Sequence, residues 1–169
     1  MDKTKVTKDL ENKTLIIERT FNAPKAKLWN AYADKDTFAK WWGPEGWETT
    51  VKEFDFHPGG RNLYAMKCVD ENQGEWFGQE SCGLMEYDTI TEPDSFVYRD
   101  FFADAEGNKM PGMPEVTITI EFVEADGTTN VISRITAETA EEIEKLVGMG
   151  MIEGFTSSTD RLDRLVAEQ

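Results

Sequence analysis

The chain has 169 residues and a net charge of −15, from 33 acidic and 18 basic residues. That length suits one domain with its own core, and the charge repels phosphate backbones and anionic lipid headgroups. Ten Phe, five Trp and seven Met exclude a disordered chain, which lacks large apolar side chains. We therefore expect a folded domain that binds no nucleic acid and, with no sufficiently long apolar run, has no membrane span.

Residues 1–13 are polar and charged, so we expect a flexible N-terminal lead-in ahead of a single domain over residues 14–169. The lead-in lacks the apolar h-region of a secretory signal, which favours a cytoplasmic protein. Residues 14–21 are rich in β-branched and apolar side chains and predict the first strand.

Two short helices are expected after this strand. Pro24 suits the first helical position, and residues 25–33 carry apolar side chains at helical spacing. Asp34 can cap a second helix that ends near Trp41.

From residue 48 onwards the sequence has the pattern of consecutive strands. Runs of β-branched and aromatic residues are separated by Gly, Pro, Asn and Asp, the usual turn formers. The expected strands cover residues 48–56, 60–69, 76–90, 95–102, 115–124 and 128–137. With the first strand they make an antiparallel sheet of about seven strands.

Residues 139–142 (TAEE) have the form of a capping box, which predicts one long helix from there to about Ala167. Its apolar stripe must be buried, and a sheet with one apolar face needs a cover. The fold class is therefore α+β, with the bent sheet wrapped around this C-terminal helix.

Residues that oppose each other in a hairpin have numbers with a constant sum, which predicts the strand registers. The expected pairs are Phe122 with Val131, Tyr98 with Tyr87, Phe102 with Val116 and Tyr64 with Ser81. Cys82 would then lie opposite Leu63, about 17 Å along the strand from Cys68. A disulfide needs a much closer approach, so we expect two free thiols, as in a reducing cytosol.

These registers collect aromatic residues, methionines and a few polar residues on the inward face. A buried polar group without a partner costs about 1–3 kcal/mol, so the polar ones must bond to each other, to water or to a ligand. The candidate cavity residues are Trp41, Phe54, Phe56, Asn62, Tyr64, Met66, Phe77, Gln79, Ser81, Met85, Tyr98, Asp100, Phe102, Met110, Met113, Ile118, Met151 and Phe155.

Several of these residues have a second interpretation that the sequence leaves open. Trp41 suits a core position as well as a cavity wall. Met110 and Met113 suit an apolar gate or an ordinary loop packed on the sheet. The inward Asp100 suits a ligand acceptor, a general base or an ion pair with Arg61.

No catalytic or metal site is evident. The only histidine, His57, lies in a turn, so no Ser-His-Asp arrangement can be assembled. There is no histidine pair and no CxxC motif, so we expect neither a metal nor a cofactor.

Four groups of residues, in order along the chain, resemble a known family. They are Ala23-Pro24 with Leu28-Trp29, then Trp41-Trp42-Gly43-Pro44, then Pro58-Gly59-Gly60-Arg61, then Gly150-Met151-Ile152-Glu153-Gly154-Phe155. Together they resemble the START-like (SRPBCC) superfamily, in the branch similar to the C-terminal domain of the activator of heat-shock protein 90 ATPase. The likeness extends from about residue 14 to the C-terminus.

The resemblance implies a helix-grip fold with a cavity between sheet and helix, and the binding of a small hydrophobic molecule. We expect a cavity of about 300 Å³ or more, the size of drug-sized ligand sites. The family has no universal catalytic residues, so an enzyme is the less favoured expectation. The alternatives are a stress protein that activates a chaperone ATPase through a protein interface, and a polyketide cyclase or hydrolase that uses Asp100 or Tyr64.

The helix glycines Gly148, Gly150 and Gly154 each weaken a helix by about 1 kcal/mol relative to alanine. Two explanations stand side by side: they make room for a ligand, or they let the helix approach the sheet closely.

Overall fold

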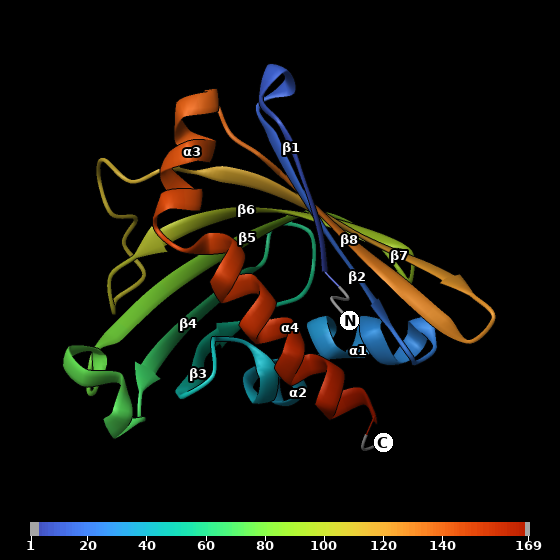
Figure 1. Cartoon of the computed structure of the whole chain (residues 1–169), viewed down its shortest axis with the longest axis horizontal. Helices are drawn as coiled ribbons and strands as arrows, with labels where there is room; N and C mark the ends of the chain where they lie inside the picture. Colours follow the sequence, from blue (N-terminus) through green and yellow to red (C-terminus); the bar gives the residue numbers. More distant parts are fainter. Residues whose placement is uncertain (1–3, 168–169) are drawn as a thin grey trace.

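The computed structural model describes residues 4–167, which form one antiparallel sheet with helices packed on its inner face (Figure 1). The strands are β1 (Thr4–Asp9), β2 (Thr14–Phe21), β3 (Trp47–Phe54), β4 (Arg61–Cys68), β5 (Glu80–Thr91), β6 (Ser95–Ala103), β7 (Val116–Ala125) and β8 (Thr128–Thr136). Their order in the sheet is β1-β2-β8-β7-β6-β5-β4-β3. The meander β3 to β8 is thus extended by β2, which pairs with β8.

Two of the predicted registers are confirmed. Phe122 lies opposite Val131 in the β7–β8 hairpin, and Tyr87 lies opposite Tyr98 between β5 and β6. Short turns leave little freedom in how such hairpins pair, so local turn signals suffice to set the register.

The other two registers are shifted by two residues. Val116 lies opposite Asp100 rather than Phe102, and Tyr64 lies opposite Gly83 rather than Ser81. For the β4–β5 pair the reason is the connection, where Glu71–Trp76 forms the short helix η2 and β5 begins only at Glu80. Side chains alternate with a period of two, so a shift of two residues leaves the assignment of faces unchanged.

Both cysteines are free thiols, as expected. Cys82 lies opposite Ala65 on β4, so it remains well away from Cys68 at the end of that strand. The revised register moves the two cysteines closer along the strand without bringing them opposite each other.

The expectation of a loose lead-in is wrong for Thr4–Asp9. This segment is the edge strand β1 and pairs along its whole length with β2. The short helix η1 (Leu10–Asn12) closes the hairpin, and the Asp9 side chain accepts a hydrogen bond from the Asn12 backbone at 3.3 Å. Because β1 is largely exposed, its sequence lacks the apolar alternation by which strands are recognised. Residues 1–3 lie outside the described part of the chain.

The two short helices are α1 (Lys25–Ala33) and α2 (Lys35–Trp41), as expected, and Asp34 caps α2 through the Thr37 backbone. The prediction of a single C-terminal helix is wrong. This segment forms two helices, α3 (Ala140–Gly148) and α4 (Met151–Ala167). Gly150 between them has φ +94°, a left-handed conformation that glycine adopts readily and that ends α3.

Thr139 caps α3 by accepting a hydrogen bond from the Glu142 backbone at 3.2 Å. Among residues 4–167, no helix combines the length and the apolar character that crossing a membrane requires.

The inner face of the sheet is filled at one end by aromatic side chains. The Trp29 ring on α1 lies edge-on to Phe56, Phe96 and Phe122, at centroid distances of 5.6, 5.8 and 5.4 Å. Such edge-to-face contacts add to the stabilisation from buried apolar area. Helix α4 runs across the same face of the sheet (Figure 1), and its Leu162 is fully buried there. This end of the interior is therefore solid core.

A buried arginine holds α4 to the sheet. Arg19 on β2 is only 5% exposed and donates to the Thr159 hydroxyl at 3.3 Å. It also pairs with Asp160 and, at 3.5 Å, with Asp163. A buried charge needs such partners, and two carboxylates supply them.

Candidate functional site

A hollow of about 230 Å³ lies between the sheet and the N-terminal half of α4. We call it the main hollow. It is lined by Trp41 of α2, Tyr64 and Met66 of β4, Tyr98 and Asp100 of β6, Ile118 of β7, Ile135 of β8, Trp42, Gly43 and Pro44 of the loop before β3, and Met151, Gly154, Phe155, Ser158 and Thr159 of α4. Most of these side chains are apolar, so the hollow suits an apolar occupant.

A second hollow of about 210 Å³, the side hollow, adjoins the first. It lies between β6, β7 and the junction of α3 with α4, and is lined by Phe102, Pro114, Val116, Leu146, Met149 and Gly150 together with Asp100 and Met151. Asp100 and Met151 line both hollows and so stand at the boundary between them.

Gly154 leaves space in the main hollow. A Cβ atom added there would meet no atom within 4 Å, so close packing of helix against sheet does not require this glycine. The structure thus favours the first of the two explanations for Gly154, because a larger side chain at this position would extend into the hollow.

Gly83 positions a wall of the main hollow. It lies opposite Tyr64 in the β4–β5 pair, and a Cβ atom at residue 83 would overlap the Tyr64 hydroxyl. The Tyr64 ring therefore lies across the β5 backbone at a site open only to glycine. Burial, and then the charge of Asp100, raises the pKa of the Tyr64 hydroxyl far above its ordinary range. It stays neutral at physiological pH.

Asp100 is the unusual group of the site. Its carboxyl oxygen Oδ1 is buried and has no hydrogen-bond partner among the described residues. Burial raises the pKa of this carboxyl from its ordinary 3.8 to about 7. The ion pair with Arg61 that the sequence allowed does not form, because Arg61 donates instead to Glu53 at 2.9 Å. Successive side chains along a strand point to opposite faces of the sheet. Arg61 lies opposite Glu86, whose side chain points outward, so Arg61 and Asp100 lie on opposite faces.

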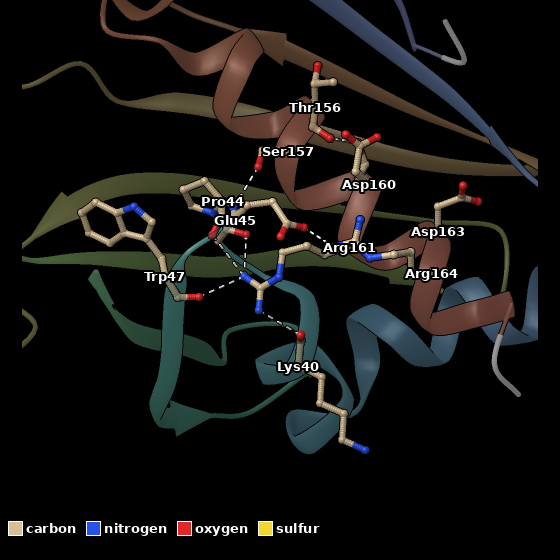
Figure 2. Close-up of polar contacts among 12 residues, drawn as sticks. Lys40, Pro44, Glu45, Trp47, Thr156, Ser157, Asp160, Arg161, Asp163 and Arg164 are labelled. Atoms are coloured by element: carbon tan, nitrogen blue, oxygen red, sulfur yellow. Dashed lines mark hydrogen bonds and ion pairs between the residues drawn. The ribbon is translucent and has the colours of Figure 1, made fainter. Parts of the chain in front are cut away.

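Arg161 of α4 holds the loop that forms one wall of the main hollow (Figure 2). Its Nη1 donates to the carbonyl oxygens of Gly43 at 2.8 Å, Trp47 at 3.1 Å and Pro44 at 3.3 Å. Its Nη2 donates to the carbonyl oxygen of Lys40 at 3.2 Å. One guanidinium thus binds carbonyl groups from the end of α2 to the start of β3. A guanidinium suits this role because its five N–H donors point in different directions in one plane.

Two further contacts join the same loop to α4. The Glu45 backbone N–H donates to the Ser157 hydroxyl at 2.8 Å, and the Glu45 carboxylate pairs with Arg164 (Figure 2). The wall formed by Trp42, Gly43 and Pro44 is therefore fixed to the helix that forms the opposite wall.

Comparison with models of protein families shows which family this chain belongs to. The family model for activator of Hsp90 ATPase homolog 1-like protein matches residues 22–167, most of the chain. The chain belongs to this family. No curated protein matches the sequence.

Solved structures agree with this membership of the Hsp90 ATPase activator homologue family. A crystal structure of a protein from Mycobacterium smegmatis is 35% identical, covers 96% of this chain and 96% of that chain, and has a TM-score of 0.86. A solution structure from Arthrobacter aurescens is 27% identical, covers 98% of this chain and 92% of that chain, and has a TM-score of 0.87. The START-like helix-grip fold expected from the sequence is thus the fold of this family member.

In this family member the structure brings eight expected residues together around the main hollow: Trp41, Tyr64, Met66, Tyr98, Asp100, Ile118, Met151 and Phe155. Phe102 lines the side hollow. Trp41 is also core, being 1% exposed, so both of its interpretations hold.

Four expected residues are wholly or partly buried elsewhere. Phe56 contacts Trp29, and Phe54 packs against Phe38 at a centroid distance of 6.1 Å. Asn62 is fully buried and donates to the Tyr87 hydroxyl at 3.2 Å, beside Met85. All four positions lie outside both hollows, and the rings of α1 and α2 pack against Phe56 and Phe54.

Five more expected residues lie near the surface. Phe77 is 49% exposed, and Gln79 and Ser81 are exposed as well, because the connection before β5 and the first residues of that strand lie at the surface. Met110 is 47% exposed, and neither it nor Met113 lines a hollow. The structure therefore favours an ordinary loop over an apolar gate at these methionines.

Sequence reasoning missed part of the α4 wall. Ser158 and Thr159 follow Phe155 by three and four residues, so they lie on the same helix face, but their polar character kept them out of an apolar stripe. Ile135 and Trp42 also line the main hollow, and so do Gly43 and Pro44, which the sequence indicates only as part of the family motif.

The residues of a hydrolase do not assemble at either hollow. His57 lies in an exposed turn with its Nδ1 2.6 Å from Asp55 Oδ1, and neither residue lines a hollow. The two candidates for proton transfer that the sequence indicates, Asp100 and Tyr64, both line the main hollow.

Proposed function

We propose that this protein binds a small apolar molecule in the main hollow. The observation that carries the proposal is an apolar space of about 230 Å³ under α4, beside a core filled with aromatic side chains. An engineered apolar cavity of about 150 Å³ accommodates benzene, so the main hollow has room for a compact ligand of one or two rings.

The expected cavity of about 300 Å³ is not reached by the main hollow alone. The ligand we propose is therefore smaller than a typical drug, or it extends into the side hollow at Asp100 and Met151. The helix-grip fold supports the proposal, because the sheet curves around a helix too narrow to fill its inner face.

Filling the space at Gly154 tests this function. Gly154→Leu is expected to weaken the binding of naphthalene at least about tenfold, because the new side chain occupies the ligand's volume. The helix itself gains, since replacing glycine in a helix stabilises it by up to about 1 kcal/mol. Isothermal titration calorimetry measures the affinity, and the fluorescence of Trp41 and Trp42 reports occupancy.

The matched control is Gly148→Leu on α3, where an added Cβ meets no atom within 4 Å and no hollow is lined. It should bind naphthalene as the unaltered protein does. If the unaltered protein binds no naphthalene, and native mass spectrometry finds no small molecule carried through purification, the proposal is wrong.

A second candidate function is activation of a chaperone ATPase through a protein interface. The β4–β5 connection exposes Val69, Trp76 and Phe77 by 44%, 57% and 49%, next to the acidic Glu71 and Glu75. Exposed aromatic groups are common at the centre of protein interfaces.

Added to purified Hsp90, the protein is then expected to raise the rate of ATP hydrolysis, and Trp76→Ala to reduce the stimulation several-fold. Val123→Ala on β7, at a residue 51% exposed, is the matched control. A rate unchanged by the unaltered protein would dismiss this function.

For either function we propose a reducing compartment such as the cytosol, which the two free thiols favour.

A further inference from the structure

We propose that the ligand carries a positively charged amino group, which binds to Asp100 at the boundary of the two hollows. This inference rests on the proposed binding function and names the chemical class of the ligand. The ligand would be an aromatic or other apolar amine, with its apolar body in the main hollow.

The first argument is the unpartnered oxygen of Asp100. A buried carboxylate oxygen without a donor is costly, whereas the buried guanidinium of Arg19 is paired with Asp160 and Asp163. Among the residues that line the two hollows, Asp100 is the one acidic group, and none is lysine, arginine or histidine. A donor for Asp100 must therefore come from outside the lining, and an ammonium group supplies both hydrogen bonds and the opposite charge.

The second argument is the aromatic character of the main hollow. Trp41, Trp42, Tyr64, Tyr98 and Phe155 all contribute to its lining. Aromatic faces attract cations and accept apolar rings, so these walls suit both parts of an aromatic amine. An anionic ligand would meet a carboxylate with no compensating cation.

The third argument is the charge of the whole protein. A net charge of −15 attracts cations and repels anions during approach. The overall field and the single charged group of the site therefore select the same ligand class.

The binding of an amine should depend on pH in a defined direction. The carboxyl must be ionised to bind the ammonium group, and burial places its pKa at about 7. The titratable groups around it are Tyr64 of β4 and Tyr98 of β6, with Tyr87 of β5 beside them, and burial raises the pKa of all three hydroxyls. They stay neutral, so Asp100 alone sets the profile and the affinity for an amine rises between pH 6 and pH 8.

The test compares matched naphthalene derivatives by calorimetry. 2-Naphthylmethylamine is expected to bind about ten- to a hundred-fold more tightly than 2-ethylnaphthalene at pH 8, the usual range for a charged hydrogen bond. Asp100→Asn should abolish this preference, and a cooperative urea unfolding transition shows that the variant is folded. The control Asp88→Asn, at an exposed position on β5, should keep the preference.

The outcomes separate this inference from the proposed function. Equal binding of the amine and 2-ethylnaphthalene by the unaltered protein overturns the inference and leaves the binding function intact. Equal binding of the amine and the neutral 2-naphthalenemethanol overturns the assignment of a cation. If none of the three compounds binds and native mass spectrometry finds no small molecule carried through purification, the proposed function fails with it.

Discussion

Arg161→Ala is expected to lower the free energy of unfolding by about 3 kcal/mol, the scale for losing charged hydrogen bonds in a partly buried site. Without the guanidinium, the carbonyl groups of Lys40, Gly43 and Trp47 lose a donor that α4 provides. The loop of Trp42, Gly43 and Pro44, which forms one wall of the main hollow, then loses these contacts with α4. Naphthalene binding should therefore weaken as well. Urea unfolding and calorimetry measure the two effects.

Arg161→Lys should recover only part of the loss, because an ammonium group cannot reach carbonyls spread around a planar guanidinium. The matched control is Arg134→Ala, which removes an arginine paired with Glu121 at 2.7 Å on the surface. Exposed ion pairs contribute at most about 1 kcal/mol, so this variant should change little. An Arg161→Ala protein as stable as the Arg134→Ala protein would contradict the role assigned to Arg161.

Asp100→Asn is expected to stabilise the protein at alkaline pH by as much as about 4 kcal/mol, given 1.36 kcal/mol for each pKa unit. Burial raises the carboxyl pKa from 3.8 to about 7, so the folded protein holds a proton that the unfolded chain has released. Between these two values, raising the pH therefore costs the unaltered protein stability. Below about pH 4 the carboxyl is neutral in both states, and above about pH 7 the full cost remains.

The measurement is the difference in unfolding free energy between Asp100→Asn and the unaltered protein, from urea unfolding at several pH values. It should be small at pH 4, rise through pH 6 and level off near pH 8. Asp88→Asn, at an exposed carboxyl, should show no such rise. A difference that is flat across this range would contradict the burial of an uncompensated charge at Asp100.

The two substitutions are expected to change the free energy of unfolding in opposite directions, because the two residues have different roles in the site. Arg161 stabilises the walls of the main hollow, whereas Asp100 inside it lowers the stability of the ligand-free protein. Groups that cost stability are common where a protein binds its ligand, because the ligand supplies the missing partner. An amine bound at Asp100 should thus raise the melting temperature more at pH 8 than at pH 6.

Local patterns in the sequence determined most of the elements and their faces. Asp34 and Thr139 cap their helices as expected, the β7–β8 hairpin has the expected register, and β5 pairs with β6 as expected from Tyr87 back to Cys82, beyond a one-residue shift near the turn. Even where the pairing moved by two residues, Tyr64 and Asp100 stayed on the inward face, because alternation along a strand has a period of two. The family motifs also lie where the fold needs a turn or a gap.

Only the tertiary structure decided where the inward face remains uncovered. The sequence predicts cavity positions for Phe54, Phe56 and Met151 alike, but side chains of α1 and α2 pack against the two phenylalanines, and only Met151 lines the hollows. The pairing of β1 with β2 and the separation of Asp100 from Arg61 likewise appear only once the strands are paired. A cavity is the space that packing leaves unfilled, so its size and place depend on how all the surrounding elements pack together. No single segment of the sequence determines it.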